Sequence, residues 1–273
     1  MLALDLATGQ HAIASAMETP LEGAALDVTI DGRPADLDQQ VLPRYTGGGL
    51  LVGTLRAEPG LYALSAAPAP AVTLNGFPLE AVAGPLWLGE TNAIEARLDR
   101  PETVPLGLRR IRVEGEPLVA RVVEALPDGA HIIEAETFSE HGLGSPSRYS
   151  HRTFLSGGVG VGEWIVPGMW LRWRLEPPAP GRYRLIVKGA THEPQADRVI
   201  LLDGEPLGGT WRVFRFEHTG GFGATPEEWA QMEVVDEAGA PLVLDLGPGA
   251  HDLRMICIDG RLNLDCLALA PAG

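Results

Sequence analysis

The sequence predicts an all-β protein made of two β-sandwich domains of jelly-roll type in tandem. Short segments with alternating apolar and polar residues recur about every ten residues, which is typical of antiparallel strands. Asn-Gly, Asp-Gly and Pro-rich turns separate these segments. The 34 Gly and 23 Pro are scattered rather than periodic, and this composition disfavours long helices. With 273 residues, of which 45% are hydrophobic, the chain can bury the cores of two medium domains.

The first domain is predicted to consist of short strands joined by tight turns, of which Asp31-Gly32 and Asn75-Gly76 are the clearest. His11, Glu90 and Glu95 are isolated polar residues, and we expect them to be solvated or to cap backbone groups. The expected strands are Leu26–Ile30, Leu50–Leu55, Leu61–Leu64, Val72–Leu74, Ala93–Leu98 and Arg110–Val113.

A boundary between the domains is expected near Leu126. The apolar segment Leu118–Val123 lies between Pro117 and a Pro-Asp-Gly turn that begins at Pro127. This segment is a strand of either domain or a short helix. The predicted domains are therefore residues 1–126 and 127–273.

The centre of the second domain is predicted to be a hairpin. Trp170–Leu175 and Tyr183–Lys188 both alternate apolar and charged residues, and a Pro-rich turn separates them. The glycines ahead of this hairpin, with Trp164, form a segment where the backbone can lie close to a flat ligand.

A weak internal echo links the two halves of the chain. Residues 58–64 read Glu-Pro-Gly-Leu-Tyr-Ala-Leu, and residues 179–185 read Ala-Pro-Gly-Arg-Tyr-Arg-Leu. A strand and an Asn-Gly or Asp-Gly turn follow in both places. Two sandwiches of similar plan explain the echo, and chance similarity between β-rich sequences is the alternative.

Three carboxylates are expected to converge in the second domain. Glu134 and Glu136 lie on one side of the segment that opens it, roughly 7 Å apart if that segment is a strand. Asp265 lies on the last strand. If the first and last strands of this domain pair, the three carboxylates come together, and they are either spread out in solvent or bind a hard cation.

The net charge of -15, without a basic stripe, excludes nucleic acid and anionic membranes as partners. No apolar run is long enough to span a bilayer. Cys257 and Cys266 flank a predicted hairpin turn and are either buried free thiols or a cross-strand disulfide. The first ten residues lack the features of a signal peptide. The protein is therefore cytoplasmic, or it is secreted or at the cell surface after removal of a leader.

From about residue 131 to 271 the sequence resembles carbohydrate-binding modules of families 6 and 35, which are β-jelly rolls. The resemblance rests on short sequence motifs that occur in the same order as in those families, and it does not include the N-terminal domain. These motifs are Ile133–Glu136, Gly162–Ile165, Pro167–Trp170, Pro178–Leu185, Gly189–Ala190, Leu202–Gly204, Gly208–Trp211, Gly249–Arg254 and Asn263–Asp265.

The resemblance implies a structural calcium ion held by Glu134, Glu136 and Asp265 with backbone carbonyls, which suits an oxygen-seeking cation. It also implies a sugar site in the loops at one end of the sandwich, where the rings of Trp164 and Trp211 hold a sugar and Asn263 hydrogen-bonds its hydroxyls. The alternative is that these two tryptophans are buried in the core. Trp170 and Trp173 are expected in the core.

The chain departs from those families in an aromatic insertion at residues 212–232, which contains Phe222 and Trp229. It covers the sugar site, rebuilds it or contacts a partner, so both residues join the candidate ligand-binding set. Within it, Thr225-Pro226 is expected to begin a helix.

These features predict non-catalytic binding of a polysaccharide or glycan, with the first domain as a second module or spacer. A structural role in which jelly-roll surfaces form a homo-oligomer is the alternative. A glycan-cleaving enzyme using Glu217 with Glu227 or Glu228, beside His192 or His218, is the third reading. No known catalytic nucleophile, zinc or phosphate-loop motif occurs in the sequence.

Overall fold

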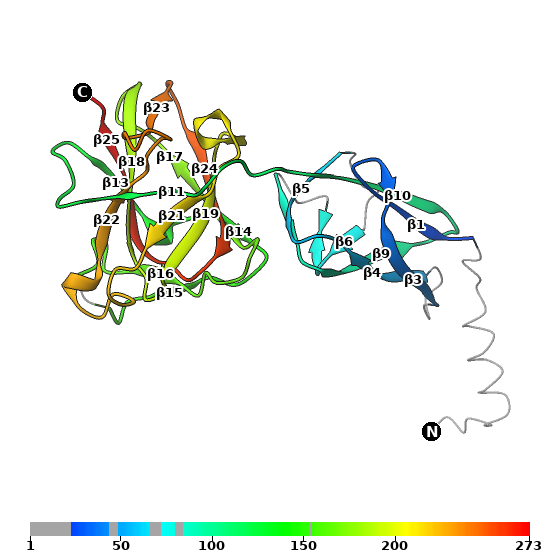
Figure 1. Cartoon of the computed structure of the whole chain (residues 1–273). Helices are drawn as coiled ribbons and strands as arrows, with labels where there is room; N and C mark the ends of the chain where they lie inside the picture. Colours follow the sequence, from blue (N-terminus) through cyan, green and yellow to red (C-terminus); the bar gives the residue numbers. More distant parts are fainter. Residues whose placement is uncertain (1–22, 44–48, 66–71, 80–83, 153) are drawn as a thin grey trace, which may run out of the picture. The chain divides into compact units, whose positions relative to one another are not determined.

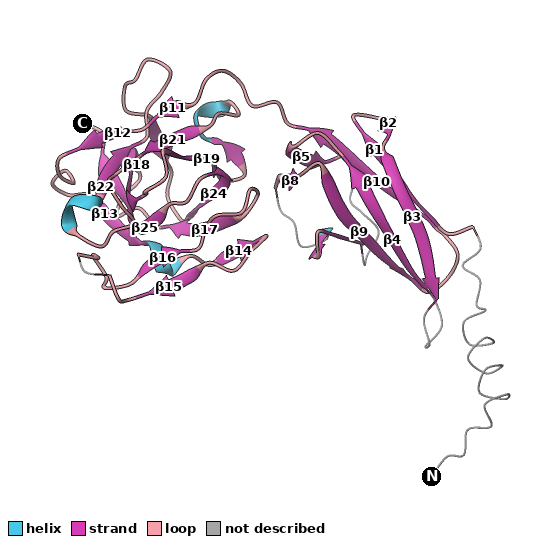
Figure 2. Cartoon of the chain, turned by 60° about the horizontal axis from the view of Figure 1, so that its bottom comes forward, coloured by secondary structure: helices cyan, strands magenta, loops and turns pink. Residues whose placement is uncertain are grey.

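The computed structural model describes residues 23–43, 49–65, 72–79, 84–152 and 154–273, and His11 lies outside them. The chain divides into two compact units, one ending at Ile111 and one spanning Arg112–Gly273. Each unit consists of two β-sheets (Figures 1 and 2). Each also has its own hydrophobic core. The predicted all-β class is confirmed, and no helix among the described residues is long and apolar enough to cross a membrane.

In the first unit, each of the two sheets has five strands. The first sheet has the order β2 (Arg33–Pro34), β1 (Ala25–Ile30), β10 (Thr103–Arg110), β5 (Gly60–Leu64) and β8 (Leu86–Leu88). The second has the order β3 (Asp36–Pro43), β4 (Gly49–Arg56), β9 (Thr91–Leu98), β6 (Val72–Leu74) and β7 (Phe77–Pro78). The strand expected at Arg110–Val113 is wrong, because β10 ends at Arg110.

The second unit has a larger sandwich. Its first sheet has the order β11 (Leu118–Val119), β21 (Phe214–Glu217), β19 (Gln195–Leu202), β24 (His251–Asp259), β17 (Trp170–Leu175) and β14 (Glu140–Gly142), with β20 (Glu205–Pro206) on β19. Its second sheet has the order β12 (Arg121–Val123), β22 (Ala230–Glu233), β18 (Gly181–Ala190), β25 (Asn263–Pro271), β16 (Gly160–Gly162) and β15 (Ser147–Tyr149). In that sheet β13 (His131–Glu134) pairs with β25, and β23 (Val243–Leu246) pairs with β18.

The predicted central hairpin is wrong, although both of its strands exist. β17 pairs with β14 and β24, whereas β18 pairs with β22, β23 and β25 in the opposite sheet. The Pro-rich turn therefore joins the two sheets. Alternation of apolar and polar residues marks a strand with one buried face, and it is the same whether the next strand lies beside it or across the core.

The turn between β24 and β25 also joins the two sheets, so Cys257 and Cys266 lie in opposite sheets. Both are buried free cysteines, which confirms the free-thiol alternative. Burial raises the pKa of Cys266 to about 12 and also raises that of Cys257. Both side chains are therefore neutral thiols at physiological pH.

The segment expected at the domain boundary is part of the second unit. β11 pairs with β21 in parallel, and β12 pairs with β22 antiparallel. The chain divides into its two compact units after Ile111, earlier than the boundary predicted after Leu126. Leu118–Val123 is thus two short strands at the edges of both sheets.

The echo in the sequence corresponds to a shared local structure. The Tyr62 hydroxyl donates to the Glu58 carbonyl at 2.8 Å, and the Tyr183 hydroxyl donates to the Ala179 carbonyl at 2.7 Å. Both are tyrosine corners, in which a side chain fixes the turn that enters its own strand. The later turns agree as well: Asn75 and Asp203 have φ of 51° and 53°, and each accepts a backbone N–H from a neighbouring strand.

The pairing of strands follows the same plan in both units. β9 lies between β4 and β6 in the first unit, and β24 lies between β17 and β19 in the second. β5 pairs with β10 and β8, as β18 pairs with β25 and β22. One difference is the first strand, because β1 runs parallel to β10 whereas β13 runs antiparallel to β25.

Candidate functional site

The topology of the second unit brings several loops together at one end of the sandwich. Ala190, the last residue of β18, lies opposite Asn263 at the start of β25. Gln195, the first residue of β19, lies opposite Glu217 at the end of β21. The segments 191–194 and 218–222 therefore lie next to Asn263. We call Tyr149, His192, His218, Phe222 and Asn263 the loop cluster.

Asn263 and Phe222 are in direct contact in the loop cluster. The Asn263 amide Nδ2 donates to the Phe222 carbonyl at 2.8 Å. The Phe222 ring is half-buried, and its centroid lies 6.0 Å from that of the exposed His192 ring. His218, also exposed, lies 5.4 Å from His192 between ring centroids. A solvent-accessible group of rings thus lies next to an anchored amide.

Tyr149 lies flat against a glycine strand beside Asn263. A Cβ atom on Gly160 would come within 2.9 Å of the Tyr149 ring, so that position requires the absence of a side chain. A Cβ atom on Gly162 would be 3.0 Å from both the Tyr149 ring and Asn263 Oδ1. The flat group that the glycine-rich segment accommodates is therefore a ring of the protein itself. The sequence alone does not indicate Tyr149, since its partner glycines follow only from the register of β15 on β16.

The prediction of an exposed ring at Trp164 is wrong. Its side chain is 1% exposed and its indole Nε1 donates to the Met169 carbonyl at 2.9 Å. The Arg198 guanidinium covers one face, 4.4 Å from the ring centroid, and Trp173 packs against it edge-on. Trp164 therefore belongs to the core, with no face available for a sugar.

Trp211 lies away from the loop cluster. It precedes β21, whereas Phe222 follows the end of that strand, and its carbonyl accepts the Glu114 N–H at 2.9 Å. The structure therefore does not bring Trp211 and Asn263 together. Of the residues expected in the core, Trp173 is fully buried, whereas Trp170 is half-buried with Arg254 stacked on its ring.

Trp229 is half-buried and supports the loop that carries Phe222. A Cβ atom on Gly223 would lie 2.3 Å from the Trp229 ring, so the loop passes directly over the indole. The expected helix after Thr225 is a single 3₁₀ turn at Pro226–Glu228. Trp229 therefore packs against the backbone directly after Phe222.

The three predicted metal ligands lie close together, although Glu136 lies in the 3₁₀ turn Ala135–Thr137 and not on the strand with Glu134 as expected. β13 pairs with β25, placing Glu134 opposite Cys266, the residue after Asp265. The Ser156 hydroxyl donates to Glu134 Oε2 at 2.6 Å and to Asp265 Oδ1 at 3.1 Å. Glu136 Oε2 is buried without a hydrogen-bond partner. Burial raises the pKa of Glu136, and repulsion from Glu134 and Asp265 adds to this rise.

A lysine supplies positive charge to this cluster. Lys188, the single lysine of the chain, places Nζ 2.6 Å from Oδ2 of the fully buried Asp265 and donates to the Phe154 carbonyl at 2.9 Å. Among the described residues, no three acidic, His or Cys side chains already enclose a position suitable for a metal ion. The oxygen donors suit calcium in chemistry and charge. For calcium to bind, the carboxylates would have to close in and the ammonium of Lys188 withdraw.

The carboxylates considered for catalysis have other partners or lie in solvent. Glu228 accepts the Ala224 N–H at 2.6 Å and packs on Gly221. Glu227 is fully exposed, and hydrogen bonds from its own N–H and from Thr225 lower its pKa. Glu217 is exposed at the end of β21. Glu228 thus maintains the shape of the loop.

No protein-family model and no curated protein matches the chain. Similar solved structures include a family 35 carbohydrate-binding module from Clostridium thermocellum, at 20% identity over 53% of this chain and 99% of that one, with a TM-score of 0.42. Another is CsCBM6-3 from Clostridium stercorarium in complex with cellobiose, at 16% identity over 55% of this chain and 100% of that one, with a TM-score of 0.39. A third is the cycloalternan-forming enzyme from Listeria monocytogenes, at 12% identity over 88% of this chain and 20% of that one, with a TM-score of 0.41.

Proposed function

We propose that the second unit binds carbohydrate without converting it, through the loop cluster. The contact between Asn263 and the half-exposed Phe222 carries this proposal, because a sugar needs two kinds of surface. The C–H face of a pyranose packs on an aromatic ring, and its hydroxyls need directional donors and acceptors. Phe222 and His192 offer the rings, while Asn263 and His218 offer polar atoms.

The sequence resemblance supports the same end of the sandwich, with one reassignment. It implied Trp164 and Trp211 as rings, but Phe222 is the ring that lies beside Asn263. The insertion that contains Phe222 therefore rebuilds the site in our proposal.

Replacing Phe222 by alanine is expected to weaken glycan binding by about 1–3 kcal/mol, the usual cost of losing an aromatic anchor. A glycan array would first identify a ligand, and titration calorimetry would then compare the variants. Trp211→Ala is the matched control: it removes a half-buried ring at the opposite end of β21, and this variant should bind as the wild type does. Unchanged binding by Phe222→Ala, or a loss confined to Trp211→Ala, would move the site away from the loop cluster. A stable oligomer without affinity for any glycan would favour the assembly role.

We also propose that Glu134, Glu136 and Asp265 hold a structural calcium ion in competition with Lys188. Calcium should raise the melting temperature of the wild type, and Asp265→Ala should abolish that rise. Lys188→Met should lower stability in chelator by about 3 kcal/mol, because a buried carboxylate loses its counter-charge, and calcium should restore it. Arg174→Met, at an exposed ion pair, controls for loss of a positive charge. Identical melting of Lys188→Met in calcium and in chelator would argue against the metal.

A further inference from the structure

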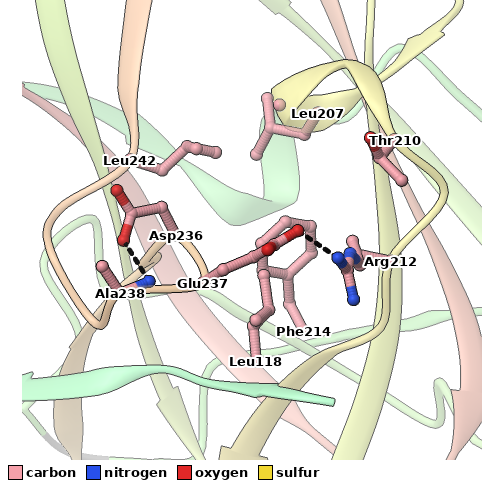
Figure 3. Close-up of a pocket in the computed structure, with 10 residues that line it drawn as sticks. Leu118, Leu207, Thr210, Arg212, Phe214, Asp236, Glu237, Ala238 and Leu242 are labelled. Carbon is pink, nitrogen blue, oxygen red and sulfur yellow. Dashed lines mark hydrogen bonds and ion pairs between the residues drawn. The ribbon is translucent and has the colours of Figure 1, made fainter. Parts of the chain in front are cut away.

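The second unit contains a pocket of about 340 Å³ that the proposed function does not use (Figure 3). It adjoins Arg212 and Phe214, so it lies at the opposite end of β21 from the loop cluster. Its volume falls at the lower end of the range for small-molecule sites, about 300–1,000 Å³. The walls come from β11, the 3₁₀ turn Leu207–Gly209, β21 and the turn at residues 236–240.

The interior of the pocket is apolar and well supported. Phe214 and Leu207 are 2% and 3% exposed, so they are firmly packed, and Leu118 and Leu242 complete the apolar lining. The turn at one wall is fixed because Asp236 Oδ1 accepts the N–H groups of Ala238 and Ala240 at 2.9 and 3.0 Å. One oxygen of the Asp236 carboxylate is therefore already committed to backbone partners.

Arg212 places a guanidinium at the rim of the pocket. Its Nη1 donates to the Glu114 carbonyl at 2.9 Å, and its Nε is buried without a hydrogen-bond partner. Gly115 makes room for it, since a Cβ atom there would lie 2.0 Å from Nη1. The guanidinium is thus held in place before any ligand binds, and its Nε–H remains without an acceptor.

The remaining partner of Arg212 is the carboxylate of Glu237. This side chain extends across the pocket to the guanidinium (Figure 3). Its side chain is 69% exposed, against 16% for Arg212, and an ion pair with so exposed a partner contributes little stability. The Glu237 carboxylate can therefore move away from Arg212 with little loss of stability. Its present place shows that a carboxylate fits against this guanidinium at the pocket mouth.

We propose that this pocket binds a small organic monocarboxylate with a compact apolar body. The ligand carboxylate replaces that of Glu237 on Arg212, where a guanidinium can donate two parallel hydrogen bonds, and the body packs on Phe214 and the three leucines. The described lining offers one cation, Arg212, beside the carboxylates of Asp236 and Glu237, so a ligand with a single negative charge fits it.

Binding of cyclohexanecarboxylate to the full chain tests this proposal, with cyclohexanecarboxamide as the neutral probe of the same shape. Methyl NMR of the leucine side chains would locate and quantify binding. The acid should bind at least about tenfold more tightly than the amide, because a charged hydrogen bond is replaced by a neutral one. Glu237→Gln should tighten acid binding, since it removes the internal competitor, and Arg212→Met should abolish the preference for the acid.

Arg182→Met, which removes an exposed arginine from another ion pair, is the matched control and should leave binding unchanged. Phe222→Ala should also leave it unchanged, which separates this pocket from the glycan site. Equal binding of acid and amide, weaker acid binding by Glu237→Gln, or shifts outside the pocket leucines would each overturn the proposal.

Discussion

Replacing Arg198 by methionine is expected to destabilise the second unit by about 3–5 kcal/mol, as removal of a buried charge with its hydrogen bonds does. The Arg198 side chain is completely buried. The carboxylate of its neighbour Asp197 accepts two hydrogen bonds from Arg215, at 2.8 and 2.7 Å. Burial lowers the pKa of Arg198, yet an arginine remains charged under all ordinary conditions.

Backbone carbonyls and an aromatic face stabilise this cation. Its two terminal nitrogens donate to the carbonyls of Asp197, Asp259, Trp164 and Gly260 at 2.8–3.3 Å. The guanidinium also stacks on Trp164. Loss of the arginine leaves these carbonyls without their donors and frees the turn that precedes Asn263. Arg198→Met should therefore also weaken glycan binding.

Denaturant unfolding of the full chain, followed by tryptophan fluorescence, measures this effect. Every tryptophan except Trp87 belongs to the second unit, so the signal reports mainly on that unit. Arg198→Lys keeps the charge but not the forked geometry and should recover only part of the loss. Arg182→Met is the exposed control. A loss below about 0.5 kcal/mol for Arg198→Met, the scale of an ordinary surface substitution, would contradict the assigned role.

Arg198 also explains why the sequence analysis placed Trp164 wrongly. A Gly-Glu-Trp segment ahead of a strand is compatible with an exposed ring or a buried one. The choice depends on Arg198, which lies on β19 and follows Trp164 by 34 positions along the chain. Nothing in the local sequence indicates that contact. In our proposal the ring at the site comes from the insertion instead, and the sequence does not single out Phe222 among the aromatic residues there.

Local chemistry made other features predictable. Asn75-Gly76 and Asp31-Gly32 adopt positive φ at both residues, as such dipeptides do in tight hairpins. The convergence of Glu134 and Asp265 followed from the expectation that the first and last strands pair, which β13 on β25 confirms. Glu136 joins them from a 3₁₀ turn, not from the same strand as expected. The ion pair between Asp265 and Lys188 was not predictable, because Lys188 has the position of a solvent-facing residue in a strand that alternates apolar and charged residues.

The alternation of apolar and polar residues does not determine every strand or its partners. β3 and the strand pairing of β17 are two examples. The sequence of β3, Asp-Leu-Asp-Gln-Gln-Val-Leu-Pro, has no clear apolar face, and its strand character comes from hydrogen bonds to β4 along its whole length. Strand partners in a sandwich depend on contacts between distant segments, whereas alternation records only burial. The sequence therefore predicts strands better than sheets.

Removing both Arg121 and Arg184 should destabilise the second unit by about 3–5 kcal/mol, because it leaves a buried carboxylate without a counter-charge. Glu233 is completely buried between them, with Arg184 Nη1 2.8 Å from one carboxylate oxygen and Arg121 on the other. Arg121 lies on β12, so the same contact attaches the segment after Ile111 to the second unit.

A further substitution distinguishes the buried charge from lost packing. If the uncompensated charge causes the destabilisation, adding Glu233→Gln to Arg121→Met/Arg184→Met should recover a large part of the lost stability, since a neutral amide costs less to bury than a carboxylate. If packing causes it, the triple variant should be no more stable than the double. Limited proteolysis gives a second measurement: Arg121→Met alone should expose the segment at residues 112–126 to cleavage, while Arg174→Met should not. Protection equal to that of the wild type would mean that the β12–β22 pairing holds this segment without the ion pair.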